Sequence, residues 1–209
     1  MRHVNLKFKV GSRLAVVGMN GSGKTTFINL LCRLYDPIEG QILLNGIDIR
    51  KYRYDEYMRI FAVVFQDFRL FALPLGQNVA AGAHYGSERV MDCLSQAGFG
   101  DRLKTLPDGL DTPLYKELDK NGVEVSGGEA QKIAIARALY QDAPFIVLDE
   151  PTAALAPIAE AEIYAKFNDI AVFDHGAIVQ YGTHDQLVAD ENGKYYELWH
   201  AQAQYYVKE

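Results

Sequence analysis

A glycine-rich segment at residues 18–25 has the residue types and the spacing that bind a polyphosphate. The segment, GMNGSGKT, fits the pattern Gly-x-x-x-x-Gly-Lys-Ser/Thr, and it lies between an apolar run at 14–17 and a helical pattern. Glycines let backbone N–H groups turn inward around phosphate oxygens, and the N-terminus of the following helix adds a partial positive charge. This context favours a phosphate loop over a glycine-rich turn with an exposed lysine.

The residues of this loop have expected roles in holding a nucleotide. Lys24 is expected to reach the β- and γ-phosphates, and the Thr25 hydroxyl is expected to ligate Mg²⁺. The residues predicted to bind the phosphates are Gly18, Asn20, Gly21, Ser22, Gly23, Lys24, Thr25 and Thr26.

Two carboxylates follow a second apolar strand. Residues 145–148 are all apolar, and Asp149 and Glu150 come directly after them. A strand of this kind would lie beside the phosphate loop, so Asp149 is expected to hold Mg²⁺ directly or through water. Glu150 is placed to orient and polarise an attacking water. The alternative, an acidic loop start after any buried strand, is disfavoured by the phosphate loop elsewhere in the chain.

A second glycine-rich turn, VSGGEAQ at residues 125–131, precedes a helix that runs through Tyr140. Ser126 and Glu129 have the spacing of a capping box, which starts a helix without any ligand. Gly127 and Gly128 instead cost helix stability, and they would be useful where a phosphate approaches the bare backbone. The residues alone leave both interpretations open.

The elements expected around these residues alternate between strands and helices. Strands are expected at 4–10, 14–17, 61–65 and 145–148, hairpins at 41–49 and 170–181, helices at 25–34, 157–168 and 194–206, and a short helix begun by a capping box at 183–186. Residues 68–140 are mostly helical in pattern. This order predicts an α/β core with a helical lobe inserted near its middle.

Composition limits the class of protein. The chain has 209 residues, of which 49% are hydrophobic and 23% charged, as in an ordinary globular domain. Its formal charge of −6 makes it a poor candidate for binding a nucleic-acid backbone. The longest apolar run, 60–65, is far shorter than the roughly 20 residues of a membrane-spanning helix, so no span is expected. Cys32 and Cys93 are expected to be buried, reduced thiols of a cytosolic protein.

Together these motifs resemble the nucleotide-binding domain of an ATP-binding cassette (ABC) transporter. The resemblance rests on residues 18–25, on Gln66 in VVFQD, on residues 125–129 and on LDEPT at 148–152, whose order and spacing match along nearly the whole chain. It implies an α/β P-loop NTPase core, with a mostly parallel sheet, an antiparallel β part and an inserted helical subdomain. Residues 1–67 and 141–209 would form the core ATPase lobe, and 68–140 the helical signature subdomain.

The resemblance also implies binding and hydrolysis of ATP with Mg²⁺. Gln66 would lie in a loop that contacts Mg²⁺ and couples to a transmembrane part. Ser126, Gly127, Gly128 and Glu129 would form the signature motif, which contacts the γ-phosphate held by the opposite subunit of a head-to-tail dimer. Glu129 stands where many family members have Gln.

Further segments are similar to those of exporter cassettes: LYDP at 34–37, GQI at 40–42 and NGVE at 121–124. The expected partners are a second nucleotide-binding domain, in a homodimer or heterodimer, and transmembrane domains that hold the chain at the cytoplasmic face of the cell membrane. No nucleic acid is expected. The alternatives are a soluble ABC-type ATPase and a weakly hydrolysing regulatory module.

Five apolar residues that follow Gln66 have two possible roles. They could form the cleft that receives a transmembrane coupling helix, or they could pack the core of the helical lobe itself. The five are Phe68, Leu70, Phe71, Leu73 and Leu75.

The sequence departs from the family pattern in three places. Ala156 in ALAP replaces a customary Asp, and the adenine-stacking aromatic of the family would lie upstream of residue 1. The strand that carries the family's switch histidine is missing between the helix at 157–168 and the strand at 170–173. Neither His175, a predicted turn residue, nor His184, at a predicted helix start, is assigned to catalysis, so slow hydrolysis is expected. A natural deletion, an engineered one and residues absent from this sequence all remain open.

Overall fold

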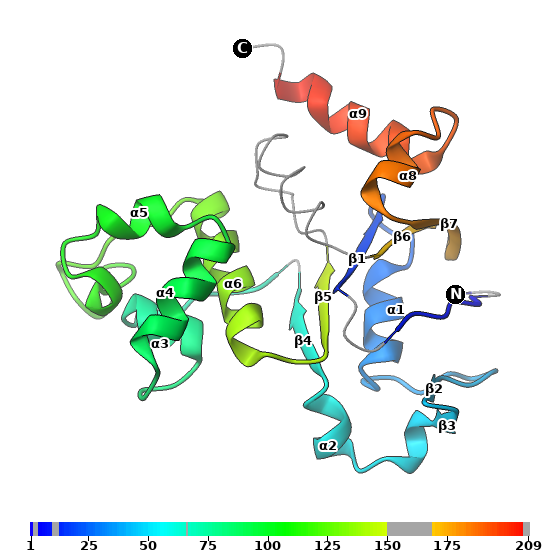
Figure 1. The fold of residues 1–209 in the computed structure, drawn as a ribbon, viewed down its shortest axis with the longest axis horizontal. Helices are drawn as coiled ribbons and strands as arrows, with labels where there is room; N and C mark the ends of the chain where they lie inside the picture. Colours follow the sequence, from blue (N-terminus) through cyan, green and yellow to red (C-terminus); the bar gives the residue numbers. More distant parts are fainter. Residues whose placement is uncertain (2–3, 10–12, 66, 150–168, 207–209) are drawn as a thin grey trace. The chain divides into compact units, whose positions relative to one another are not determined.

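A computed structural model describes residues 1, 4–9, 13–65, 67–149 and 169–206 (Figure 1). The predictions for Gln66, Glu150, Ala156 and the helix at 157–168 lie outside these residues. The chain divides into two compact units, one formed by 1–66 with 143–209 and the other by 67–142. Each unit is described by itself.

The first unit is built on a sheet of five described strands in the order β4-β5-β1-β6-β7. The strands are β4 (Phe61–Val64), β5 (Phe145–Asp149), β1 (Arg13–Gly18), β6 (Asp169–Asp174) and β7 (Ala177–Gly182). Neighbouring strands are parallel except β6 and β7, which form the predicted antiparallel hairpin. The mostly parallel α/β fold is therefore confirmed.

Helices and short elements complete this unit. They are α1 (Lys24–Leu31), β2 (Leu43–Leu44), β3 (Ile47–Asp48), η1 (Ile49–Lys51), α2 (Tyr54–Met58), α8 (His184–Val188) and α9 (Lys194–Tyr206). The tight turn between β2 and β3 is as predicted, because Asn45 (φ 52°) and Gly46 (φ 79°) both take the left-handed conformation that such a hairpin needs.

The two faces of β1 are buried in two different cores. Leu14 and Val16 pack in a cluster with Phe27 and Ile28 of α1, whereas Ala15 and Val17 pack in a cluster with Leu187 and Tyr195 of α8 and α9. Alternate side chains of a strand point to opposite faces, so an uninterrupted apolar run is what a strand covered on both sides requires. The carboxyl end of β1, where the phosphate loop begins, is thereby fixed from both sides.

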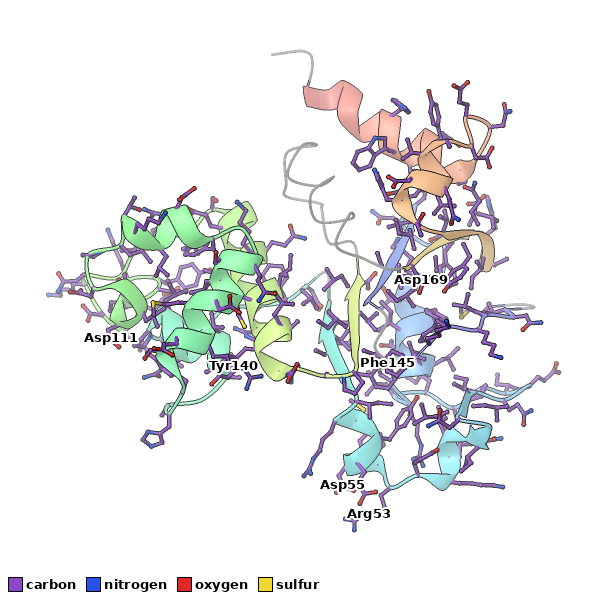
Figure 2. The ribbon with its side chains drawn as sticks, viewed as in Figure 1. Arg53, Asp55, Asp111, Tyr140, Phe145 and Asp169 are labelled. Carbon is purple, nitrogen blue, oxygen red and sulfur yellow. The ribbon has the colours of Figure 1, made fainter. Side chains whose placement is uncertain are left out.

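The predicted strand at 4–10 is wrong for the residues that the structure describes. Residues 4–9 form no strand, yet the alternation has the expected effect on burial: Val4, Leu6 and Phe8 pack on the first core while the residues between them are exposed. The Phe8 ring meets Phe145, which is labelled in Figure 2, edge-on at 5.5 Å. An alternating pattern indicates which side chains are buried. A strand also needs a neighbouring strand to which its backbone can hydrogen-bond, and the pattern does not indicate whether one is present.

The second unit is helical. It contains α3 (Leu75–Ala80), α4 (Ser87–Gln96), α5 (Gly100–Lys104), the 3-10 turn η2 (Gly109–Asp111) and α6 (Gly127–Gln141). Helix α6 packs against α3 and α4. The side chain of Asn78 bonds the backbone of Phe71 and Leu73, and the Arg137 Nε donates to the Asn78 carbonyl at 2.7 Å. At one end of α6, the Arg89 guanidinium lies 4.7 Å from the centre of the Tyr140 ring (Figure 2).

Strand β6 lies directly beside β1. The register pairs Leu14 with Asp169 and Gly18 with Phe173, so within the described ranges no strand lies between them. Because parallel strands end at the same edge of a sheet, the turn that follows β6 reaches the edge where the phosphate loop begins. No local sequence pattern indicates that β6 and β1 are neighbours.

Candidate nucleotide site

The backbone of the predicted phosphate loop depends on its glycines. Gly18 (φ 151°), Gly21 (φ 80°) and Gly23 (φ 102°) all have positive φ values that L side chains rarely adopt. A Cβ atom on Gly18 would also collide with the Phe173 carbonyl oxygen and would lie 2.7 Å from Ser22 Oγ. The loop is closed by the Ser22 N–H, which donates to the Met19 carbonyl at 3.0 Å.

The N-terminus of α1 is prepared for an anion. Its N-cap is Gly23, no side chain of the described residues caps it, and its first turn holds no acidic residue. The first amides of a helix have no partner within the helix, and the helix dipole places partial positive charge there. The Ser22 side chain is buried, and its Oγ has no hydrogen-bond partner among the described residues. A buried hydroxyl without a partner is costly, so these groups fit phosphate oxygens.

Lys24 lies inside the loop. Only 5% of the residue is exposed, and its Nζ donates to the carbonyls of Gly18 at 2.6 Å and Met19 at 2.9 Å. The loop carbonyls therefore hold an ammonium group within the cradle that the loop forms, which is where a polyphosphate needs a positive charge.

The two predicted metal ligands that the structure describes are in contact. Thr25 Oγ1 donates to Asp149 Oδ2 at 2.9 Å, and Asp149 is buried at the carboxyl end of β5. Magnesium prefers hard oxygen ligands and is held by one or two protein groups together with phosphate oxygens. Thr25 and Asp149 thus fit Mg²⁺. In the described ranges, no group of three or more acidic, His or Cys side chains could hold a metal without such help.

The second glycine-rich turn is a fully formed capping box. Ser126 is the N-cap of α6: its Oγ accepts from the Glu129 N–H at 3.2 Å, and its own N–H donates to Glu129 Oε2 at 2.8 Å. The structural interpretation of this turn is therefore confirmed, while the predicted contact of residues 126–129 with a partner's nucleotide stays a prediction.

Arg102 is a neighbour of this turn that the sequence did not reveal. Its Nε lies 2.7 Å from Glu129 Oε1. Burial raises the pKa of Glu129, but the Ser126 N–H bond and the Arg102 charge outweigh that effect and leave the pKa below its usual value. Arg102 lies on α5, a separate helix, so no local pattern around Glu129 could have indicated the pair.

The apolar residues after Gln66 have different surroundings, and the role in receiving a coupling helix stays a prediction. Leu75 is completely buried in the core of the second unit. Phe68 and Leu70 line a cavity of about 560 Å³ together with Tyr115 and Leu118. Phe71 and Leu73 are exposed.

The two histidines that the sequence left unassigned have different surroundings. His184 Nδ1 lies 2.8 Å from the Tyr195 hydroxyl, and the ring meets Trp199 edge-on at 4.9 Å, which joins α8 to α9. Burial lowers the pKa of His184. His175 lies in the β6–β7 turn, whose next residue, Gly176, donates its N–H to the Ser22 carbonyl of the phosphate loop at 2.9 Å.

Comparison with known proteins decides the family. The family model described as "ABC transporter" matches residues 1–153. The chain belongs to the ABC transporter family. The ATP-binding domains of this family are P-loop ATPases, so the chain is an ABC-type ATPase domain that binds nucleotide.

Curated relatives match almost the whole of this chain. An ATP-dependent lipid A-core flippase of Idiomarina loihiensis is 38% identical over 226 residues, which cover 97% of this chain and 38% of the relative. The subtilin transport ATP-binding protein SpaT of Bacillus subtilis is 39% identical, with 90% and 34% covered. The mitochondrial iron-sulfur clusters transporter ATM1 of Kluyveromyces lactis is 34% identical, with 97% and 31% covered. The chain spans well under half the length of each relative.

A solved structure shares the fold. The structure of a bacterial Atm1-family ABC exporter with ATP bound aligns with a TM-score of 0.76 at 32% identity, over 96% of this chain and 38% of that one. Among the described residues of the present chain, no helix is both long enough and apolar enough to span a bilayer.

Proposed function

We propose that this chain is the ATP-binding and ATP-hydrolysing domain of an ABC exporter and powers transport through ATP-driven head-to-tail dimerisation. The observation that carries the proposal is the phosphate loop: an uncapped helix start, a buried lysine inside the loop, and the Thr25–Asp149 pair beside it. The names of the relatives, a flippase and two transport proteins, support export as the process that ATP drives.

The loop binds the phosphates of ATP. Lys24 exchanges its bonds to the Gly18 and Met19 carbonyls for bonds to the β- and γ-phosphates. The amides of residues 18–26 and the Ser22 hydroxyl bind further phosphate oxygens. The ammonium group therefore has hydrogen-bond acceptors both with and without bound ATP, so the loop can bind the phosphates without changing its conformation.

The residues that would hold Mg²⁺ come from the phosphate loop and from the end of β5. Thr25 and Asp149 would bind the ion, with Gln66 as a proposed third contact. When bound, Mg²⁺ neutralises charge on the phosphate oxygens. Glu150, the next residue after Asp149, orients the attacking water and accepts its proton.

The proposed partners follow from the two units. The core ATPase lobe, residues 1–67 and 141–209, holds the nucleotide. The helical subdomain, residues 68–140, supplies residues 126–129 to the ATP of a second nucleotide-binding domain. Its cavity beside Phe68 and Leu70 is the proposed docking site for transmembrane domains, which place the chain at the cytoplasmic face of the membrane.

A second candidate function is a weakly hydrolysing nucleotide-binding module. Within the described ranges β6 occupies the position beside β1, and no strand carrying a histidine in the family's switch context lies there. Steady-state phosphate release from the purified chain separates the two candidates, since only the first predicts turnover that Glu150→Gln abolishes.

Calorimetry with Mg-ATP tests the nucleotide site. Lys24→Ala removes charge-assisted bonds to two phosphates, each worth roughly 1.5–3 kcal/mol, so we expect affinity to fall by at least about 100-fold. Lys51→Ala is the matched control, because Lys51 is an exposed lysine of the same unit away from the loop, and its affinity is expected to stay within about twofold of wild type. Unchanged affinity of a folded Lys24→Ala variant would contradict the site.

Light scattering tests the dimer. Glu150→Gln is expected to retain ATP but lose turnover, so the ATP-bound dimer should accumulate at saturating Mg-ATP. A variant that stays monomeric far above micromolar concentration would exclude the head-to-tail arrangement for this chain. Co-purification with a transmembrane subunit distinguishes an exporter from a soluble ABC-type ATPase.

A further inference from the structure

Glu129 places a negative charge at the start of α6. Its side chain folds back to the Ser126 N–H, which donates to Oε2 at 2.8 Å. The pKa of Glu129 lies below its usual value, so the carboxylate is ionised near neutral pH. A carboxylate in the first turn of a helix offsets the partial positive charge that the helix dipole produces there. By itself, Glu129 would therefore make this helix start less attractive to a phosphate.

Arg102 supplies a compensating positive charge from another helix, α5. Its Nε donates to Glu129 Oε1 at 2.7 Å, and its Nη1 donates to the Thr105 hydroxyl at 2.9 Å. The Thr105 hydroxyl in turn donates to the Arg102 carbonyl at 2.7 Å. The guanidinium is thus held by two different neighbours. Its bond to the carboxylate is charge-assisted, the stronger kind of hydrogen bond.

The fold has little need of this ion pair. The capping box of α6 requires a side-chain acceptor three residues after Ser126, and a glutamine meets that requirement as well as Glu129 does. Both side chains of the pair are partly exposed, and ion pairs of that kind contribute little to stability. Stability therefore gives no reason for an arginine to be held against this carboxylate.

We propose that Arg102 is a positioning residue of the ATP-driven dimer, which cancels the charge of Glu129 so that the start of α6 can face a partner's ATP. The inference rests on the proposed function, in which residues 126–129 approach that nucleotide. Gly127 and Gly128 present the first N–H groups of α6, which have no partner within the helix. With the ion pair intact, a phosphate meets these groups without a net opposing charge. Without Arg102, a carboxylate and a phosphate would be brought together, which opposes association.

Dimer formation tests this inference. In the Glu150→Gln background at saturating Mg-ATP, light scattering over a range of protein concentrations gives the dissociation constant of the dimer. We expect Arg102→Gln to raise that constant by about tenfold, because the carboxylate at each site then lacks its compensating charge. Arg102→Lys keeps the positive charge, so it should raise the constant less than Arg102→Gln does.

The substitution Glu129→Gln provides the decisive comparison, because it removes the charge that Arg102 cancels. In a chain that already carries Glu129→Gln, we expect Arg102→Gln to change the dissociation constant by less than about twofold. A residue that only supports the fold of the helical unit would not be rescued in this way. Lys104→Gln is the matched control: Lys104 is an exposed cation of the same helix that pairs with Asp101, and its loss should have an effect below about twofold.

The outcomes separate this inference from the proposed function. An unchanged dissociation constant in folded Arg102→Gln overturns the inference alone. A loss of the same size with and without Glu129→Gln also overturns it, because Arg102 would then act directly or through the fold. If the Glu150→Gln chain itself stays monomeric at saturating Mg-ATP, the dimer and this inference both fail. A loss that Glu129→Gln suppresses supports the role of Arg102, and Arg102→Met repeats the comparison if Arg102→Gln does not fold.

Discussion

Helices α1 and α6 each start at a glycine-rich turn, but their N-termini differ. Helix α1 begins after Gly23 with no side-chain cap, and the side chain of its first residue, Lys24, is buried and bonded to the loop carbonyls. Helix α6 begins after Ser126 with a complete capping box, and Glu129 in its first turn is paired with Arg102. The N-terminus of α1 therefore has no side-chain cap among the described residues, whereas the capping box satisfies two N–H groups at the N-terminus of α6.

The charges follow the same division. The start of α1 combines the helix dipole with an ammonium group and has no carboxylate in the first turn, so it attracts an anion by itself. At α6 the Glu129 carboxylate opposes any approaching phosphate unless Arg102 offsets it. A glycine-rich helix start is thus not one kind of site. Its caps and nearby charges decide whether the chain alone holds a ligand there.

The substitution Gly18→Ala is expected to lower stability most, because the start of α1 depends on the backbone conformation of the loop before it. The added Cβ would collide with the Phe173 carbonyl and force a strained φ, so we expect a loss of roughly 2–5 kcal/mol in unfolding free energy. Gly21→Ala is the matched control: its φ is also positive, but no atom lies within 4 Å of the new Cβ, so about 1 kcal/mol is expected. If urea unfolding found the same loss of stability for Gly18→Ala and Gly21→Ala, the contact of the loop with Phe173 would not be what holds the loop in its conformation.

The substitution Ser126→Ala tests the N-terminus of α6, which is stabilised by the side chains of its capping box. Losing the cap should cost about 1 kcal/mol of unfolding free energy. The ATP affinity of the single chain should not change, because the proposed nucleotide site lies in the other unit. Ser87→Ala is the control, an exposed serine in the first turn of α4 that makes no cap. If calorimetry found that Ser126→Ala lowers the ATP affinity as much as Lys24→Ala is expected to, the two helix starts would not differ in the way proposed.

Local signals predicted most of the fold and of the backbone geometry of the proposed phosphate loop. The loop at 18–25, the capping boxes at 126–129 and 183–186, and the β2–β3 turn are each encoded within a few residues, and each forms as expected. Asp149 at the end of β5 was predicted from one apolar run, because a buried strand and its carboxyl end are also local features.

The errors and omissions depend on contacts between distant residues. The segment 4–9 has the right burial but lacks the backbone partner of a strand. The Arg102–Glu129 pair joins two helices, and the contact of Gly176 with Ser22 requires knowing which strand pairs with β1. Periodicity and capping rules carry no information about such pairings.

The substitution Glu129→Gln is expected to lower stability least. It distinguishes the contribution of the capping hydrogen bonds of α6 from that of the Glu129 charge. Gln at this position still accepts the Ser126 N–H, so the capping box remains and only the ion pair with Arg102 is lost. Both side chains are partly exposed, at 36% for Arg102 and 26% for Glu129, so we expect roughly 0.5 kcal/mol or less.

The pH dependence of that difference gives a sharper test than its size. Because the pKa of Glu129 is lowered in the folded chain, its contribution is complete above the ordinary value of 4.5 and is lost as the pH falls through the folded pKa. The stability of wild type relative to Glu129→Gln should therefore be constant near neutral pH and should shrink in acid. Urea unfolding of both proteins at about pH 7 and about pH 3 measures this. A difference that persists in acid would mean that the carboxylate charge is not what Arg102 stabilises, and that the start of α6 is held by its hydrogen bonds alone.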